Sequence, residues 1–245
     1  MILMYHNIAE EAGFNTVTES QFISQLGFIL ENGYKVISLE DYVESRKNNN
    51  FRENSLCITF DDAYKSFAEK VVPIMVARSM PVTVFVPSGY IGMYNVWDED
   101  ASAVRLEIMN EPEIRDLTKT PLVTIGSHGI SHRPLAKLDS SELKNEIIGS
   151  KTHLEIITGK EIKYFSYPFG QHKHFSAMAV KLLKEAGYEA ALSTNWNRFN
   201  STLNLFSLNR IEIEPKDTIE DFRQKIHSKY HLKYYKQKVK NLLRL

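Results

Sequence analysis

Short runs of consecutive apolar residues alternate with amphipathic segments along most of the chain. Such runs predict strands that are buried on both faces, whereas apolar residues spaced three and four apart predict helices. The predicted strands cover residues 2–5, 34–39, 56–60, 82–86, 122–125, 162–167, 190–194 and 208–213. The predicted helices cover about 18–32, 67–78, 111–117, 139–158 and 176–186, with a short one beginning at 38. This alternation predicts a parallel sheet with helical crossovers, and seven or eight strands in one domain favour a closed barrel.

Local signals indicate where several of these elements begin and end. Thr18 and Gln21 have the spacing of a capping box, and Asn32 with Gly33 forms a stop signal. A polar stretch at residues 45–54 predicts a loop, and residues 89–110 lack a regular pattern.

The composition excludes several classes of protein. Of 245 residues, 43 % are hydrophobic and 24 % are charged, with a net charge of zero, which argues against a surface built for nucleic acid. The single cysteine, Cys57, excludes an internal disulfide and a cysteine-rich zinc site, and it lies in a predicted buried strand. The sequence has no apolar run of membrane-spanning length and no secretory signal pattern. It therefore predicts a cytoplasmic protein.

Polar residues that can carry chemistry follow four predicted strands. Asp61 and Asp62 follow the strand at 56–60, and His128 and His132 follow the strand at 122–125. A Pro-Phe-Gly turn at 168–170 follows a third strand, and His6 follows the first. Because carboxyl ends of parallel strands meet on one face of an α/β fold, we expect these groups to share a site.

The types and spacing of these residues suggest a hydrolytic metal centre. On a helical turn, two imidazoles four residues apart point the same way, as two ligands of one metal must. A carboxylate would complete a His-His-Asp set with open positions, and a neighbouring carboxylate could accept a proton. Each feature also has an ordinary structural explanation: one histidine can pack while the other is exposed, and adjacent aspartates can cap a helix.

Three motifs resemble those of the polysaccharide deacetylases, also called carbohydrate esterase family 4 or the NodB-homology domain. They are Thr59-Phe60-Asp61-Asp62-Ala63-Tyr64, the H-x-x-x-H motif from His128 to His132, and Phe165-Ser166-Tyr167-Pro168-Phe169-Gly170. The segments 4–8 and 208–211 resemble the branch that deacetylates poly-N-acetylglucosamine exopolysaccharide.

This resemblance implies a deformed (β/α) TIM-like barrel of about seven strands in a single domain. We place the barrel at residues 1–221 and a basic helix or tail at 222–245. The resemblance also implies a hydrolase that removes N-acetyl groups from an acetamido sugar of a polysaccharide, oligosaccharide or lipid-linked precursor. Its metal would be zinc, with cobalt, nickel and manganese as alternatives.

The family roles carry over residue by residue. Asp62, His128 and His132 would bind the metal, and Asp61 would be the base that activates metal-bound water. The backbone N–H of Phe169 would help to stabilise the oxyanion. In the branch resembled here the acid comes from the N-terminal Tyr-His motif, which assigns it to His6, with His227 as the alternative.

Two positions depart from the family pattern. Ser166 stands where the family often has an arginine that tethers the catalytic aspartate, so another residue or the N-terminal segment would have to replace it. Asn195 stands where many members have aspartate. These departures motivate an alternative function, a catalytically weak sugar-binding member of the same fold. A second alternative is an amide hydrolase for a small non-sugar amide.

The remaining candidates concern substrate and membrane contacts. Tyr167, Pro168, Trp196 and Trp97 are predicted to bind substrate, although both tryptophans could instead pack in the core or over the barrel rim. Basic and apolar residues interleave in 222–245, which predicts either a solvated terminal helix or peripheral contact with an anionic membrane.

Overall fold

The computed structural model describes residues 1–52, 54–97, 104–197, 200 and 204–227. Seven parallel strands close into a barrel, because β1 pairs with β5 on one side and with β10 on the other. They are β1 (Ile2–Tyr5), β5 (Ser55–Phe60), β6 (Val82–Val86), β7 (Val123–Ser127), β8 (Tyr164–Ser166), β9 (Ala190–Trp196) and β10 (Leu208–Glu212). The short β4 (Lys35–Val36) pairs with the start of β5. The predicted single-domain barrel of about seven strands is confirmed.

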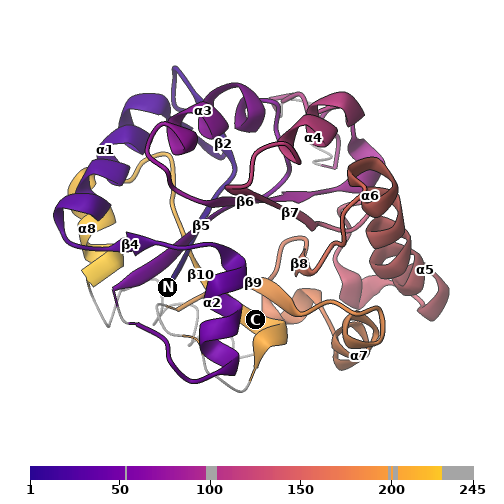
Figure 1. Cartoon of the computed structure of the whole chain (residues 1–245). Coiled ribbons are helices and arrows are strands. Elements are labelled where there is room, and N and C mark those ends of the chain that lie inside the picture. The colour runs from indigo at the N-terminus through magenta and orange to yellow at the C-terminus, as the bar shows by residue number, and fades with distance from the viewer. Residues whose placement is uncertain (53, 98–103, 198–199, 201–203, 228–245) are drawn as a thin grey trace.

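Helices surround the strands, and α2 (Leu39–Lys47) crosses the near side of the barrel in Figure 1. The surrounding helices are α1 (Glu19–Glu31), α3 (Val72–Val76), α4 (Glu111–Leu117), α5 (Ser140–Lys144), α6 (Ser150–Thr158), α7 (Ala177–Glu185) and α8 (Ile219–His227). Of two π-helical turns, η1 (Phe67–Val71) runs directly into α3, and η4 (Asn145–Gly149) joins α5 to α6. Short 3₁₀ turns are η2 (Ser88–Tyr90), η3 (Leu135–Lys137), η5 (His172–His174) and η6 (Leu205–Ser207).

Capping chemistry sets the helix starts where the sequence predicts them. The Thr18 hydroxyl accepts a hydrogen bond from the Gln21 N–H, and the Gln21 side chain accepts one from the Thr18 N–H. Asp139 and Glu142 form the same reciprocal pair at α5. These side chains satisfy backbone donors that the first helical turn leaves free, so the boundaries follow from local sequence.

Several predicted boundaries differ from the structure. The strand predicted at 34–39 shrinks to β4, because the Ser38 hydroxyl accepts from the Asp41 N–H and starts α2. That helix continues to Lys47, inside the predicted loop. The strand predicted at 162–167 shortens to β8, and the helix predicted at 139–158 contains η4. The sequence also gave no sign of β2 (Asn7–Ala9) and β3 (Thr16–Thr18), which pair with each other.

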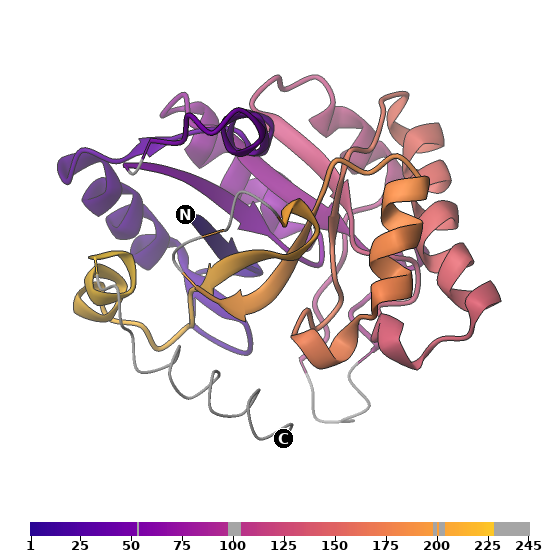
Figure 2. The same cartoon turned by 90° about the horizontal axis from the view of Figure 1, so that it is seen from below.

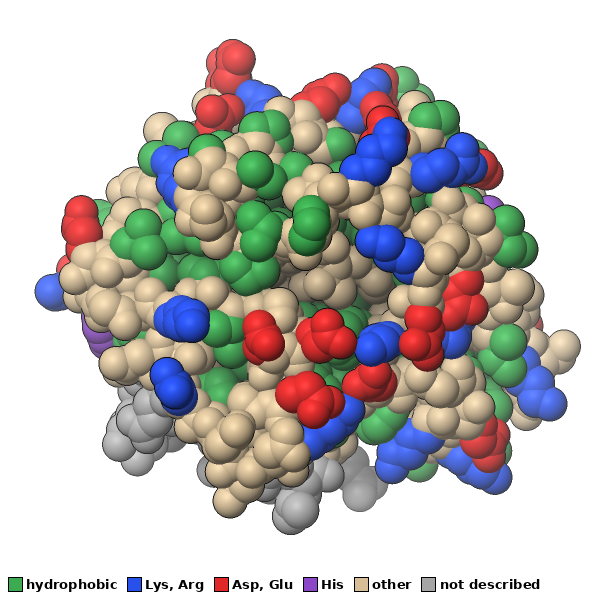
Figure 3. All heavy atoms as spheres, in the orientation of Figure 1, with side chains coloured by type: hydrophobic (Ala, Val, Ile, Leu, Met, Phe, Trp, Pro, Cys, Tyr) green, Lys and Arg blue, Asp and Glu red, His purple; other side chains and the backbone are tan. Residues whose placement is uncertain are grey.

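One end of the barrel is closed by α2. Its buried residues Leu39, Tyr42 and Val43 join a cluster with interior residues of the strands, among them Ile2 and Phe85. Two ion pairs, Lys47 with Glu189 and Glu40 with Lys163, tie α2 to the residues that precede β9 and β8. Figure 3 shows acidic and basic side chains gathered below the centre of the face of the molecule that carries α2. The amino ends of the strands are therefore covered by α2.

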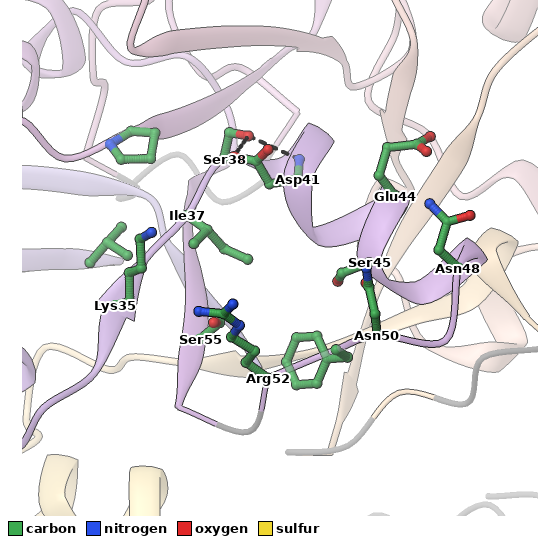
Figure 4. A pocket seen from close by; sticks show the side chains of 13 residues that line it. Lys35, Ile37, Ser38, Asp41, Glu44, Ser45, Asn48, Asn50, Arg52 and Ser55 are labelled. Atoms are coloured by element: carbon green, nitrogen blue, oxygen red, sulfur yellow. Dashed lines mark hydrogen bonds between the residues drawn. The ribbon is translucent and has the colours of Figure 1, made fainter.

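A hollow of about 570 Å³ lies beside α2 (Figure 4). Lys35, Asp41, Glu44 and Arg52 contribute charges of both signs to its lining, and Ser55 at the start of β5 also faces it. None of the predicted site residues lines this hollow. It lies at the amino end of β5, whereas Asp61 and Asp62 follow the carboxyl end.

The last described helix, α8, packs beside α1 (Figures 1 and 2), with the Phe28 and Phe222 rings 5.9 Å apart. It spans the predicted boundary between residues 221 and 222, and its Lys225 forms a buried ion pair with Asp217. Residues 228–245, which hold most of the predicted basic segment, lie outside the described residues. Among the helices of the described chain, none is long and apolar enough to cross a bilayer.

Candidate active site

The strand β5 ends by placing two aspartates at the carboxyl end of the barrel. Asp61 is 2 % exposed and Asp62 is 4 % exposed. The Asp61 N–H donates to the Tyr5 carbonyl of β1, so barrel closure fixes where the chain leaves the strand. Asp62 and Ala63 then adopt positive φ, of 71° and 53°, and the chain turns sharply away.

Three potential metal ligands meet beside this turn. His128 follows β7, and His132 lies four residues further on; both are buried. Their Nε2 atoms lie 3.5 and 3.3 Å from Oδ1 of Asp62. The three ligand atoms all lie within 4.8 Å of one another. The structure thus brings together Asp62, His128 and His132, as the sequence predicts.

The chemistry of these three groups fits a metal cation. Oδ1 of Asp62 accepts no hydrogen bond from the described residues, although it is buried. Burial raises the pKa of Asp62, but His132, with smaller effects of His6 and His128, outweighs burial and lowers that pKa. Burial also lowers the pKa of His128 to about 4, which keeps its imidazole neutral. Two imidazoles and one carboxylate are ligands typical of a catalytic zinc site.

A hydrogen bond orients one of the two imidazoles. Nδ1 of His128 lies 2.7 Å from the Ser166 carbonyl, so it carries the proton and leaves Nε2 free to face Asp62. Such contacts to a carbonyl commonly fix the tautomer of a metal-binding histidine.

Asp61 is held by an arginine that the sequence analysis did not assign. Arg210 of β10 is fully buried, and its two terminal nitrogens donate to Oδ1 and Oδ2 of Asp61 at 2.7 and 2.6 Å. The same guanidinium donates to the Ser166 hydroxyl at 2.8 Å, and Ser166 donates to Asp61 at 3.2 Å. Arg210 therefore replaces the family arginine that is missing at position 166, and it orients the Asp61 carboxylate.

This arrangement keeps Asp61 ionised. Burial raises its pKa, but Arg210, with smaller effects of His128 and His6, lowers the pKa below its usual value. A bidentate contact with a guanidinium also fixes the plane of the carboxylate. The sequence contained one signal, because Arg210 lies in the segment 208–211 that resembles the exopolysaccharide branch.

Comparison with known proteins agrees with this geometry. The family model for polysaccharide deacetylase matches residues 48–191, more than half of the chain. The chain belongs to the polysaccharide deacetylase family.

Relatives that are named for a specific deacetylase share less than a quarter of their aligned residues with this chain. A poly-beta-1,6-N-acetyl-D-glucosamine N-deacetylase of Staphylococcus aureus is 23 % identical over 219 residues, covering 86 % of this chain and 72 % of that protein. The Escherichia coli protein of the same name is 22 % identical, covering 91 % of this chain and 38 % of that protein.

Solved structures share the fold. The Streptococcus pyogenes deacetylase PplD, in complex with acetate, has a TM-score of 0.76 at 23 % identity and covers 92 % of this chain and 97 % of its own. IcaB from Ammonifex degensii has a TM-score of 0.75 at 17 % identity, with coverage of 92 % and 94 %.

The two candidates for the acid of this deacetylase lie in different places. His6 is half-buried between β1 and β2, and it lies close enough to Asp61 and Asp62 to help lower the pKa of both carboxyls. His227 lies on α8, where Nδ1 is 3.3 Å from the Tyr34 hydroxyl. Tyr34 directly precedes β4, at the amino ends of the strands, so the structure brings His6 and not His227 to the site.

The turn at 168–170 also approaches the candidate metal ligands. Phe169 has a φ of 57°, and its ring lies 5.0 Å from the His132 ring. Its N–H donates no hydrogen bond to another described residue, whereas its carbonyl accepts from the Thr194 hydroxyl. Pro168 shares this turn, and the Gly170 N–H donates to its carbonyl.

The aromatic residues predicted to bind substrate differ in accessibility. Trp97 is half-buried, and its ring stacks on His132 at 4.2 Å. Trp196 is 3 % exposed and pairs in register with Arg210. Tyr167 is fully buried, with its ring stacked on Phe175 and its hydroxyl donating to the Phe206 carbonyl. Among these three residues of the described chain, Trp97 is the one whose ring stacks on a candidate metal ligand, His132.

Proposed function

We propose that this chain is a metal-dependent hydrolase that removes N-acetyl groups from an acetamido sugar in a glycan or glycan precursor. The observation that carries the proposal is the buried cluster of Asp62, His128 and His132 beside an aspartate that Arg210 keeps ionised. The activity named for the relatives supports β-1,6-linked poly-N-acetylglucosamine, or a fragment of it, as the substrate.

Asp62, His128 and His132 would hold the cation. We propose zinc, with cobalt, nickel and manganese as substitutes, because the imidazole and carboxylate ligands suit these ions. When bound, such an ion lowers the pKa of a water molecule and polarises the acetamide carbonyl. Three protein ligands leave coordination positions open for these two groups.

The neighbouring residues would carry the protons and the charge. Asp61 accepts a proton from the attacking water, and Arg210 keeps its carboxylate ionised and oriented. The Phe169 N–H donates to the developing oxyanion. His6 then protonates the leaving amine, because an amide nitrogen leaves poorly as an anion.

Substrate contacts and location stay predictions. The half-buried Trp97 is proposed to contact the sugar through its side chain. The sequence also predicts contacts by Pro168, Trp196 and Tyr167, but all three are buried, which does not favour side-chain contact. The cytoplasmic location and the peripheral membrane contact of the basic C-terminal segment remain predictions too. The basic residues from 228 onward lie outside the described part of the chain.

The test separates the roles of the two adjacent aspartates. Metal content is measured by elemental analysis, and acetate release is measured on β-1,6-linked N-acetylglucosamine oligomers. Asp61→Asn should keep the metal but lose turnover by about 10²–10⁴-fold, the usual scale for loss of a general base. Asp62→Asn and His128→Ala should lose the metal itself.

Asp116→Asn is the matched control, because Asp116 is an exposed aspartate of α4 and should change neither quantity. Equal loss of metal in Asp61→Asn and Asp62→Asn would overturn the division of roles between these two aspartates. A metal-loaded wild-type protein without turnover would instead indicate a sugar-binding member of the fold. Turnover confined to simple amides would indicate the non-sugar hydrolase.

A further inference from the structure

A buried carboxylate lies under the three residues that join the two proposed metal-binding histidines. Glu146, on η4, is 5 % exposed. Its Oε2 accepts hydrogen bonds from the Ile130 N–H at 2.7 Å and the Ser131 N–H at 3.1 Å. The Ser131 hydroxyl donates to Oε1. One side chain thus holds two successive residues of the loop from His128 to His132.

This loop supplies the compensation that a buried carboxylate needs. In the described chain, no lysine, arginine or histidine forms an ion pair with Glu146, so its hydrogen bonds come from the loop. Burying a polar group costs free energy unless hydrogen bonds replace its lost hydration. The loop and the carboxylate therefore depend on each other.

The loop backbone is shaped around Glu146. Gly129 has a φ of 77°, and a Cβ atom at this position would lie 2.7 Å from Oε2 of Glu146. A side chain at 129 would therefore collide with the carboxylate as well as strain the backbone.

The two imidazoles differ in what holds them. His128 has its own hydrogen bonds, since its N–H donates to the Val86 carbonyl and its Nδ1 contacts the Ser166 carbonyl. The Nδ1 atom of His132 has no hydrogen-bond partner among the described residues. Its ring is held by the stacked Trp97 ring, and its backbone has a φ of 52°. The position of His132 therefore depends on its loop more than that of His128 does.

We propose that Glu146 is a positioning residue for His132, replacing through the backbone the hydrogen bond that usually fixes a metal-binding imidazole. It touches neither the cation nor the substrate and acts through Ile130 and Ser131. This inference rests on the proposed function, because it assumes that His132 binds a metal.

The test compares metal affinity with folding. In Glu146→Gln, an NH₂ group replaces one of the two accepting oxygens. Both oxygens accept from the Ser131 N–H, so in either orientation of the amide the loop loses part of its support. Zinc affinity, measured by competition with a chromophoric chelator, should fall by about 10–100-fold, as for other residues that orient metal ligands. The visible spectrum of the cobalt-loaded variant should differ from that of the wild type, because the His132 ligand is displaced.

Two further variants complete the design. Glu142→Gln is the matched control, since Glu142 also accepts a backbone N–H, from Asp139, but is exposed and outside the loop. It should keep wild-type zinc affinity. Ser131→Ala removes only the hydroxyl donor, so it should weaken zinc binding less than Glu146→Gln does. If Glu146→Gln fails to fold, the zinc affinity of Ser131→Ala tests the positioning role instead.

The possible outcomes are distinguishable. If the wild-type protein itself binds no zinc, the proposed function fails. If the wild-type protein binds zinc and a folded Glu146→Gln protein binds it equally well with an unchanged cobalt spectrum, the positioning role alone is wrong. Unchanged affinity in Ser131→Ala, where Glu146→Gln does not fold, leads to the same conclusion.

Discussion

Several residues of the site have a backbone conformation that side chains usually avoid. Asp62, Ala63, His132 and Phe169 all have positive φ without being glycine. Such a conformation costs a residue with a Cβ atom roughly 1–2 kcal/mol, and it persists only where the surroundings enforce it. All four lie in the three motifs that form the candidate site, so the backbone strain lies at that site.

The contact between Arg210 and Asp61 gives a prediction at this scale. Arg210→Met removes the guanidinium and leaves a buried, unpaired carboxylate, which should lower the free energy of unfolding by about 3–5 kcal/mol in urea denaturation at pH 7. Burial still raises the pKa of Asp61 when Arg210 is absent. The acid limb of the pH–rate profile should therefore move to higher pH.

The sign of the pH dependence follows from the lowered pKa of Asp61. Stability from this pair is complete above the unfolded-state pKa of about 3.9 and is lost as the pH falls through the lower folded-state pKa. Arg210→Met should therefore lack this part of the acid transition. Arg133→Met is the control, because Arg133 is exposed and pairs with Glu142. An unchanged pH–rate profile in Arg210→Met would count against the tether.

His6 gives a second prediction for a single residue. His6→Ala should keep the metal and the fold but lose amide turnover by about 10²–10⁴-fold, because no acid protonates the leaving nitrogen. On an activated acetate ester, whose leaving group needs no proton, the loss should be smaller. Comparison of the two substrates measures this difference, and His227→Ala is the control. Equal losses on both substrates would contradict an acid role.

At the scale of elements, α2 behaves as part of the barrel core. Its apolar residues contact interior side chains of the strands, and its exposed residues form ion pairs with the rim. Exposed ion pairs contribute little to stability, so burial of the apolar face holds this helix in place. The amino end of the barrel is thereby closed, which leaves the carboxyl end for the site.

Leu39 tests this role of α2. Leu39 is 0 % exposed, and Leu39→Ala should lower the free energy of unfolding by about 2–5 kcal/mol, since it removes buried methyl groups and leaves a cavity. Leu30 of α1 is 53 % exposed, so Leu30→Ala is the matched control and should change stability far less. Urea unfolding measures both, and similar effects would show that α2 is not a core element.

At the scale of the whole molecule, the proposed cation joins two separate parts of the barrel. Asp62 follows β5, and His128 and His132 follow β7. A ligand that binds the folded state but not the unfolded chain raises the free energy of unfolding by RT ln(1 + [L]/Kd). Metal binding should therefore stabilise the entire fold.

Thermal and urea unfolding with and without a chelator test this expectation. At a free zinc concentration of 100 times Kd, the free energy of unfolding should rise by about 2.7 kcal/mol over that of the chelated protein. Asp62→Asn should show no such rise. A wild-type protein whose stability does not depend on zinc would contradict zinc binding to the fold, and the same rise in Asp62→Asn would place the cation elsewhere.

The sequence by itself determined the features that depend on neighbours along the chain. The capping box of Thr18 and Gln21 marked the start of α1, and buried apolar runs marked the barrel strands. The motifs at Asp61 and His128 identified the family and the three candidate metal ligands that the structure brings together. These signals are readable because hydrogen bonding within one turn and burial of one strand involve residues a few positions apart.

The tertiary structure decided which distant side chains meet inside the barrel. Arg210 and Asp61 are 149 positions apart, and Glu146 lies 15 positions from Ser131 on a separate helical turn. The sequence therefore showed that position 166 lacked an arginine without showing what replaced it. Strand register and barrel closure bring β5, β8 and β10 around one interior, and their side chains meet only once that closed sheet exists.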